Sequence, residues 1–154
     1  MQEVRALTEK ERVSTFKSSD FKKLLEKLSE LGLLKESTLL LEKLVNKEPE
    51  NPGWSLMLAK IYLDSGELLK AKKTIDLLLT IQPSDISILE LKTLISFELG
   101  EEASEITFLK ENFEKEQAGK RLMRGLLLAD AMLKASMDSE AEKIYLLLAN
   151  EYPL

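Results

Sequence analysis

Carboxylates, lysines and hydroxyls are the side chains with which this chain could do chemistry, because its 154 residues include no histidine and no cysteine. Histidine is the commonest general base and metal ligand, and cysteine supplies thiolate nucleophiles, disulfides and zinc ligands. Serine–histidine triads, cysteine nucleophiles and zinc thiolate sites are therefore excluded. We expect no enzyme, and we assign no catalytic, cofactor-binding or metal-binding residue.

The remaining polar groupings fit helix starts better than active sites. The run Ala118-Gly119-Lys120-Arg121 is the nearest approach to a phosphate-binding loop, but neither GxxxxGK[ST] nor GxGxxG occurs. We interpret it as a helix-initiating loop. The pair Glu101-Glu102 fits the first turn of a helix, where negative charge is favourable.

The overall charge argues against a nucleic acid partner. The chain has 22 basic and 27 acidic residues and a net charge of -5, whereas phosphate binding needs a concentrated basic surface. Lys70, Lys72 and Lys73 form the densest basic stretch, which we interpret as a solvated helix face.

Membrane insertion is not expected either. No window of eighteen apolar residues is present, and the first twenty residues lack the apolar core of a secretory signal. The absence of cysteine suits a soluble reducing compartment, and the residues do not choose between cytoplasm and plastid stroma.

The elements that position these side chains repeat with a period of about 34 residues, a length that predicts stacked helical hairpins. Gly32 recurs as Gly66 and Gly100, and Pro49 recurs as Pro83. Apolar residues at helical spacing recur with them: Leu24, Leu28, Leu34, Leu41 and Leu44 become Leu58, Tyr62, Leu68, Ile75 and Leu78. Stacks of this kind bind other proteins far more often than they catalyse reactions.

We predict a linker or short helix over 1–17 and a repeat domain over 18–154. The repeats span about 18–51, 52–85, 86–119 and 120–154. Each glycine ends the first helix of a hairpin and each proline ends the second. Asn51, Ser84 or Asp85, and Asp138 are the predicted helix caps. The step from Pro83 to Pro153 is slightly longer than two periods, so a two-residue insertion is expected in or just after the third repeat, whose pattern is degraded.

At these positions the chain resembles the tetratricopeptide repeat family. The second repeat supplies the motif most completely, with Trp54, Leu58, Ala59, Tyr62, Gly66, Leu68, Ala71, Ile75 and Pro83. The other repeats depart from the motif. Leu25 stands at a position that usually holds a small residue, Ser37 replaces alanine and Ser136 replaces glycine. The resemblance covers about 18–154 and implies an all-α, right-handed superhelical solenoid of about four hairpins.

The resemblance also implies a concave groove, lined by the first helix of each hairpin, that binds a peptide or helix of a client protein. Transferred position by position, the groove has a mixed composition. Its residues are Lys22, Glu26, Leu56, Met57, Lys60, Leu63 and Asp64. Glu26 and Met57 stand where family members that clamp the acidic tail of the large cytosolic chaperones need asparagine, so the chain is not expected to be such a clamp.

A looser likeness links the segments 39–72 and 126–145 to tetratricopeptide proteins of plastids and cyanobacteria, including the slow-greening type. That likeness implies an assembly or biogenesis role and a chloroplast location.

Two alternatives to a client-binding scaffold stay open. Leu146, Leu147 and Leu148 are consecutive in the last predicted helix, and no polar capping helix follows them. In the first alternative the chain is a structural or self-associating segment of a longer repeat array. We favour such a fragment over a chain that dimerises through its uncapped last repeat. The third interpretation is the regulatory domain of a larger protein.

Overall fold

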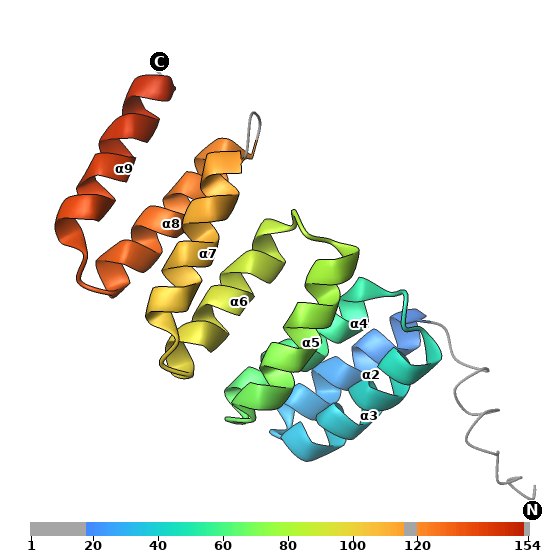
Figure 1. Ribbon diagram of the computed structural model, residues 1–154. Helices are drawn as coiled ribbons and strands as arrows, with labels where there is room; N and C mark the ends of the chain where they lie inside the picture. Colours follow the sequence, from blue (N-terminus) through green and yellow to red (C-terminus); the bar gives the residue numbers. More distant parts are fainter. Residues whose placement is uncertain (1–17, 116–119, 153–154) are drawn as a thin grey trace, which may run out of the picture.

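A computed structural model describes residues 18–115 and 120–152, and within these ranges it shows eight α-helices and no strand (Figure 1). The prediction of an all-α repeat fold is confirmed. The expected linker over 1–17 and the features at Gly119 and Pro153 lie outside the described residues. The helices are α2 (Ser18–Glu30), α3 (Leu34–Lys47), α4 (Pro52–Asp64), α5 (Leu68–Ile81), α6 (Ile86–Glu98), α7 (Glu102–Lys115), α8 (Arg121–Lys134) and α9 (Asp138–Glu151).

The turn inside each hairpin is left-handed, as the glycine repeat predicts. Gly32, Gly66 and Gly100 have φ of +70°, +76° and +74°. After α4, the N–H of Glu67 donates to the carbonyl of Tyr62 at 2.8 Å, which closes the turn characteristic of glycine-terminated helices. In the fourth hairpin Ser136 takes this role with φ of 61°. This conformation is energetically unfavourable for a residue that has a Cβ atom.

Two of the predicted caps are confirmed and one is wrong. The Asn51 side chain accepts from the N–H of Gly53 at 3.0 Å, and that of Asp85 accepts from the N–H of Ile88 at 3.2 Å. Asp138 is instead the first residue of α9. The position before it is Met137, which makes no side-chain cap.

The third hairpin keeps the register of the second despite its degraded motif. Both bounds of α6 follow those of α4 by one repeat period, and both bounds of α7 follow those of α5 by the same step. The predicted insertion comes afterwards. The turn residue Ser136 follows Gly100 by slightly more than one period, and α8 has 14 residues where α6 has 13.

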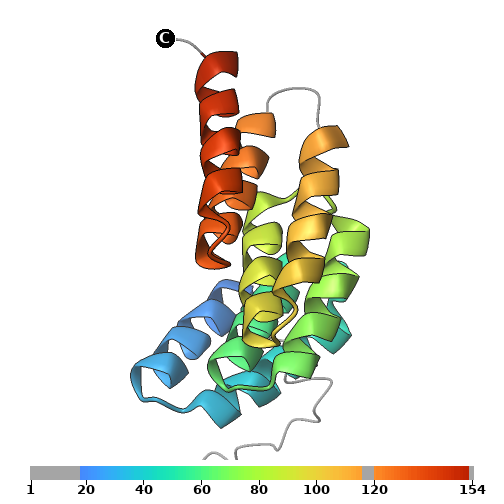
Figure 2. The same ribbon diagram turned by 60° about the vertical axis from the view of Figure 1, so that its left-hand side comes forward.

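The hairpins stack in a row (Figures 1 and 2). Each second helix packs on its own hairpin partner and on the first helix of the next hairpin, as α5 does between α4 and α6. First helices also meet one another, α4 with α6 and α6 with α8. They therefore form the inner row of the solenoid, the side on which a groove is expected.

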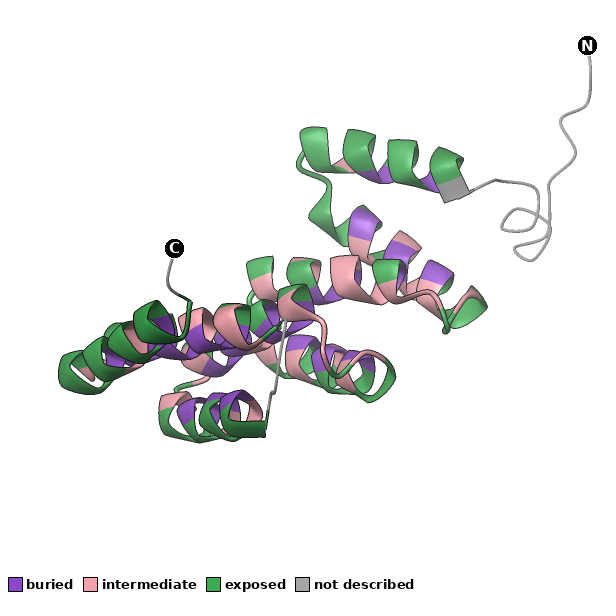
Figure 3. Cartoon of the chain, turned by 90° about the horizontal axis from the view of Figure 1, so that it is seen from above, coloured by how far each residue is buried: buried purple, intermediate pink, exposed green. Residues whose placement is uncertain are grey.

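The core runs between the two rows and consists of two hydrophobic clusters (Figure 3). The first extends from Phe21 to Ile95 and the second from Ile106 to Leu148, so the division falls between α6 and α7. Ala59 and Ala71 are fully buried, which agrees with their expected role of letting two helices approach closely.

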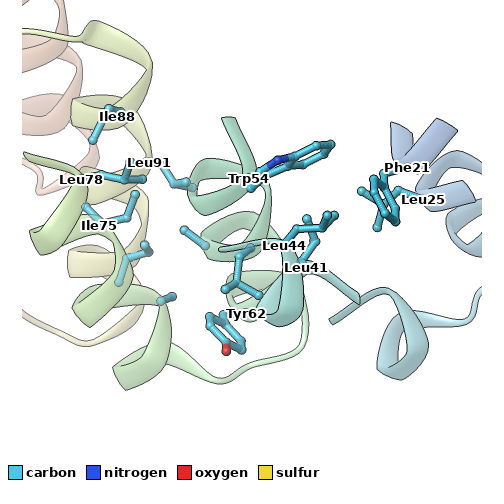
Figure 4. Packing of buried hydrophobic residues seen from close by; sticks show 14 residues of the cluster. Phe21, Leu25, Leu41, Leu44, Trp54, Tyr62, Ile75, Leu78, Ile88 and Leu91 are labelled. Atoms are coloured by element: carbon cyan, nitrogen blue, oxygen red, sulfur yellow. The ribbon is translucent and has the colours of Figure 1, made fainter. Parts of the chain in front are cut away.

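Figure 4 shows how the first cluster is arranged, with Trp54, Leu41 and Leu44 packed between α3 and α4 and Phe21 and Leu25 facing them from α2. Two expectations for this hairpin are wrong. Leu24 and Leu34, predicted on apolar faces, are 46% and 43% exposed. No described hairpin precedes the first one to cover Leu24, whereas Leu34 opens onto the space between α2 and α4.

Candidate functional site

A hollow of about 410 Å³ opens between α2 and α4, with part of α3 in its wall. We call it the N-terminal hollow. Its apolar surface comes from Leu25, Leu34, Met57 and Ile61, and its polar surface from Glu26, Ser29, Glu30, Ser37, Lys60 and Asp64. Carboxylates and an ammonium group therefore meet at one opening in the inner row.

The structure brings four of the seven predicted groove residues to this hollow. They are Glu26, Met57, Lys60 and Asp64. The other three lie elsewhere. Lys22 is exposed on α2 away from the lining, whereas Leu56 and Leu63 are half-buried and pack against the first hydrophobic cluster. The two leucines of the predicted groove thus contribute to the core.

A second hollow of about 410 Å³ lies between α6 and α8, and we call it the C-terminal hollow. The sequence analysis assigned no residue here. A shift of one repeat period from Leu56 and Lys60 leads directly to Glu90 and Leu94, which both line it. The sequence therefore indicates these two residues once the third repeat is aligned in register with the second, despite the poor motif of the third repeat.

The third hairpin also contains a buried polar cluster that the sequence analysis missed. Glu105 on α7 is 1% exposed, and its carboxylate accepts hydrogen bonds from Thr93 at 2.9 Å, from Ser96 at 3.1 Å and from the ammonium group of Lys92. Lys92 also lies 4.0 Å from the centre of the Phe108 ring. These four residues, Lys92, Thr93, Ser96 and Glu105, are named the Glu105 cluster.

The Glu105 cluster occupies the places that carry the apolar motif in the second hairpin. A shift of one repeat period converts Leu58 to Lys92, Ala59 to Thr93, Tyr62 to Ser96 and Ala71 to Glu105. All four replacements are polar and mutually compatible, because a buried carboxylate needs a cation and hydrogen-bond donors around it. In the third hairpin, four polar residues that bind one another thus replace four residues of the apolar motif.

A smaller cavity of about 170 Å³ borders this cluster between α5, α6 and α7. Lys72 and Glu101 form an ion pair at its edge, with 3.1 Å between Nζ and Oε2. Both side chains are about two-fifths exposed, so the pair is solvated and contributes little to stability.

Hydrogen bonds and burial shift the pKa values of three side chains in the described hairpins. Trp54 and then Asn51 donate to Glu48, which lowers the pKa of that carboxyl group. Burial, followed by the hydrogen bond to Glu42, raises the pKa of Tyr62. A hydrogen bond from the Tyr145 hydroxyl to Asp130, beside the C-terminal hollow, raises the pKa of Tyr145 to about 12.

The described ranges contain no candidate metal site and no helix that could span a membrane. Within 18–115 and 120–152, no three carboxylate, histidine or cysteine side chains gather where they could hold a metal ion. The helices of the same ranges are all too short or too polar to cross a bilayer.

The fold and these hollows define a helical-repeat solenoid with an accessible inner row. Solved structures agree with this class. Two structures of nearly identical TPR-like repeats from a Podosopora anserina protein assigned as a kinesin light chain superpose with TM-scores of 0.70 and 0.71. The first, a point variant, is 17% identical, with 90% of this chain and 79% of that chain covered. The second is 16% identical, with 93% and 83% covered.

A third similar structure is MamA RS-1, as an ArsTM double mutant, with a TM-score of 0.61 and 12% identity. The superposition covers 87% of this chain and 76% of that one. No curated protein matches the sequence. At these identities the solved structures establish the fold.

Part of the sequence also matches a known family. The model of the tetratricopeptide repeat family matches residues 30–95, and the fold similarity extends over most of the chain. Residues 30–95 therefore match the tetratricopeptide repeat family, and the described helices outside them share the fold of TPR-like repeats. Folds of this family are generally non-catalytic scaffolds for protein–protein interaction.

Proposed function

We propose that this chain is a scaffold that binds a peptide or helix of a client protein along its inner row. The observation that carries the proposal is the pair of hollows between first helices, α2 with α4 and α6 with α8. Each combines apolar surface with exposed charge, which is the composition of sites that seat extended or helical segments. A role in assembly or biogenesis of a complex depends on what the client is.

The test is affinity capture from a lysate of the source organism with four baits of equal net charge. One is the unmodified chain. The N-terminal hollow variant carries Lys60→Glu and Asp64→Lys, and the C-terminal hollow variant carries Glu90→Lys and Lys134→Glu. The control exchanges Lys73→Glu and Asp76→Lys on the outer helix α5, away from both hollows.

We expect a client that the unmodified and control baits retain and that at least one hollow variant loses. Equal capture by all four baits would place the binding surface outside the inner row. Loss with the control bait alone would assign binding to the outer face of α5.

A second candidate function is self-association through α9. Leu146 and Leu147 are 57% and 40% exposed, as expected for a run of three leucines, whereas Leu148 is buried. Exposed apolar side chains that adjoin one another favour association. Sedimentation equilibrium of the unmodified chain and of Leu146→Glu/Leu147→Glu tests this, and a monomer at high concentration in both samples would exclude it.

A further inference from the structure

The floor of the C-terminal hollow is apolar, with large side chains left partly exposed. Leu94 and Met123 are 44% and 46% exposed within it, and Leu126 and Leu127 beside them are half-buried. Leu94 stands where the second hairpin has Lys60, one repeat period earlier. Large side chains left half-exposed side by side favour a ligand that removes them from water.

The charge around this floor is predominantly negative. Each of the two helices contributes one exposed carboxylate to the lining, Glu90 from α6 and Asp130 from α8. The Tyr145 hydroxyl holds Asp130 in place by a hydrogen bond. The cation of the lining is Lys134, whose ammonium group lies 5.5 Å from the centre of the Phe97 ring.

We propose that the C-terminal hollow recognises a protein segment whose apolar side chains are flanked by lysine or arginine. This rests on the proposed scaffold function and names the partner chemistry for one of its two hollows. The apolar side chains of the segment cover Leu94 and Met123, and its cations pair with Glu90 and Asp130. An acidic segment is repelled by the same two carboxylates.

The N-terminal hollow has a similar balance of charge. Glu26, Glu30 and Asp64 line it together with Lys60, so carboxylates outnumber the cation there too. The proposal concerns the interface between α6 and α8, so the binding that it describes should weaken when that interface alone is altered.

The experiment uses a displayed library of short random peptides selected on the full chain. The most enriched peptide is then made with a fluorescein label and titrated by anisotropy. One protein variant removes the charge, Glu90→Gln/Asp130→Asn, and another removes the apolar floor, Leu94→Ser/Met123→Ser. The matched control, Glu111→Gln/Glu142→Gln, removes the same charge from exposed positions on α7 and α9, which do not line the hollow.

We expect enriched peptides with apolar residues and net positive charge. Binding should weaken about tenfold in each hollow variant, as the loss of two partly solvated ion pairs or of two apolar contacts implies, and should stay unchanged in the control. Equal weakening by the control would show attraction to overall charge and overturn the proposal. Enrichment of acidic peptides, or binding that neither hollow variant weakens, would overturn it too, while leaving the scaffold function intact.

Discussion

The Glu105 cluster allows a quantitative test of how the third hairpin is held together. Its carboxylate is 1% exposed and is paired with Lys92, whose side chain is 19% exposed. Removing that cation by Lys92→Met leaves a buried carboxylate with the hydroxyl groups of Thr93 and Ser96 as its remaining donors in this cluster. Breaking a buried ion pair from one side costs about 3–5 kcal/mol.

We expect a cost of about 3 kcal/mol, at the low end of that range, because the neighbouring cavity of about 170 Å³ gives water a route to the carboxylate. The reciprocal change, Glu105→Ala, should cost less than Lys92→Met, since Lys92 is partly exposed and its flexible side chain can carry the charge to solvent.

The double variant Lys92→Leu/Glu105→Ala is the decisive one. It gives the third hairpin the residues that the second hairpin has at Leu58 and Ala71, so neither charge of the pair remains. Replacing both members of a buried pair by apolar residues is often neutral or stabilising. We therefore expect the free energy of unfolding to return to within about 1 kcal/mol of the original chain.

Urea denaturation followed by circular dichroism at the helical signal measures these variants on one scale. With Lys92→Leu as the matching single variant, the coupling between positions 92 and 105 should be about 2 kcal/mol or more, as for residues in one hydrogen-bonded network. Two results would contradict this reasoning: a cost of Lys92→Met no larger than that of a surface substitution, or a double variant as unstable as Lys92→Met. Either would show that the buried pair of Lys92 and Glu105 does not hold the third hairpin together as argued.

Three further predictions concern local packing and titration. Ser136→Gly should stabilise the chain by about 1 kcal/mol in thermal unfolding, because it relieves a left-handed φ of 61° that glycine adopts freely; a lower melting temperature would contradict this. Gly125→Ala should destabilise it by about 1–3 kcal/mol, because the added Cβ would lie 2.7 Å from Leu148 Cδ2; an unchanged urea midpoint would show that Leu148 yields freely. The hydrogen bond to Asp130 raises the pKa of Tyr145 from 10.0 to about 12, so its stabilising contribution should be complete below pH 10 and be lost as the pH rises through 12. Ultraviolet titration should lose a late tyrosine transition in Tyr145→Phe and show it earlier in Asp130→Asn.

Much of the fold followed from the sequence because its signals are local. A glycine in a left-handed turn, a side chain that caps the next turn, and a proline at the first helical position each act within a few residues. Gly66, Asn51 and Asp85 could therefore be placed without knowledge of the rest of the molecule. Asp138 failed because an acidic residue in the first turn of a helix looks the same as one that caps it.

Tertiary structure decided which of the predicted positions line a hollow and which pack against the core. Leu56 and Lys60 both lie on α4, yet packing against the first hydrophobic cluster buries part of one and the N-terminal hollow exposes the other. Leu24 is exposed although its motif position is buried in the second hairpin, because burial depends on a neighbouring hairpin.

The Glu105 cluster shows the division most clearly. The polar residues at four motif positions of the third hairpin can be read from the sequence, since a shift of one repeat period is enough to find them. Only the folded hairpin decided that they satisfy one another, because Lys92 and Glu105 come from different helices, and the carboxylate meets its three donors once α6 and α7 pack together.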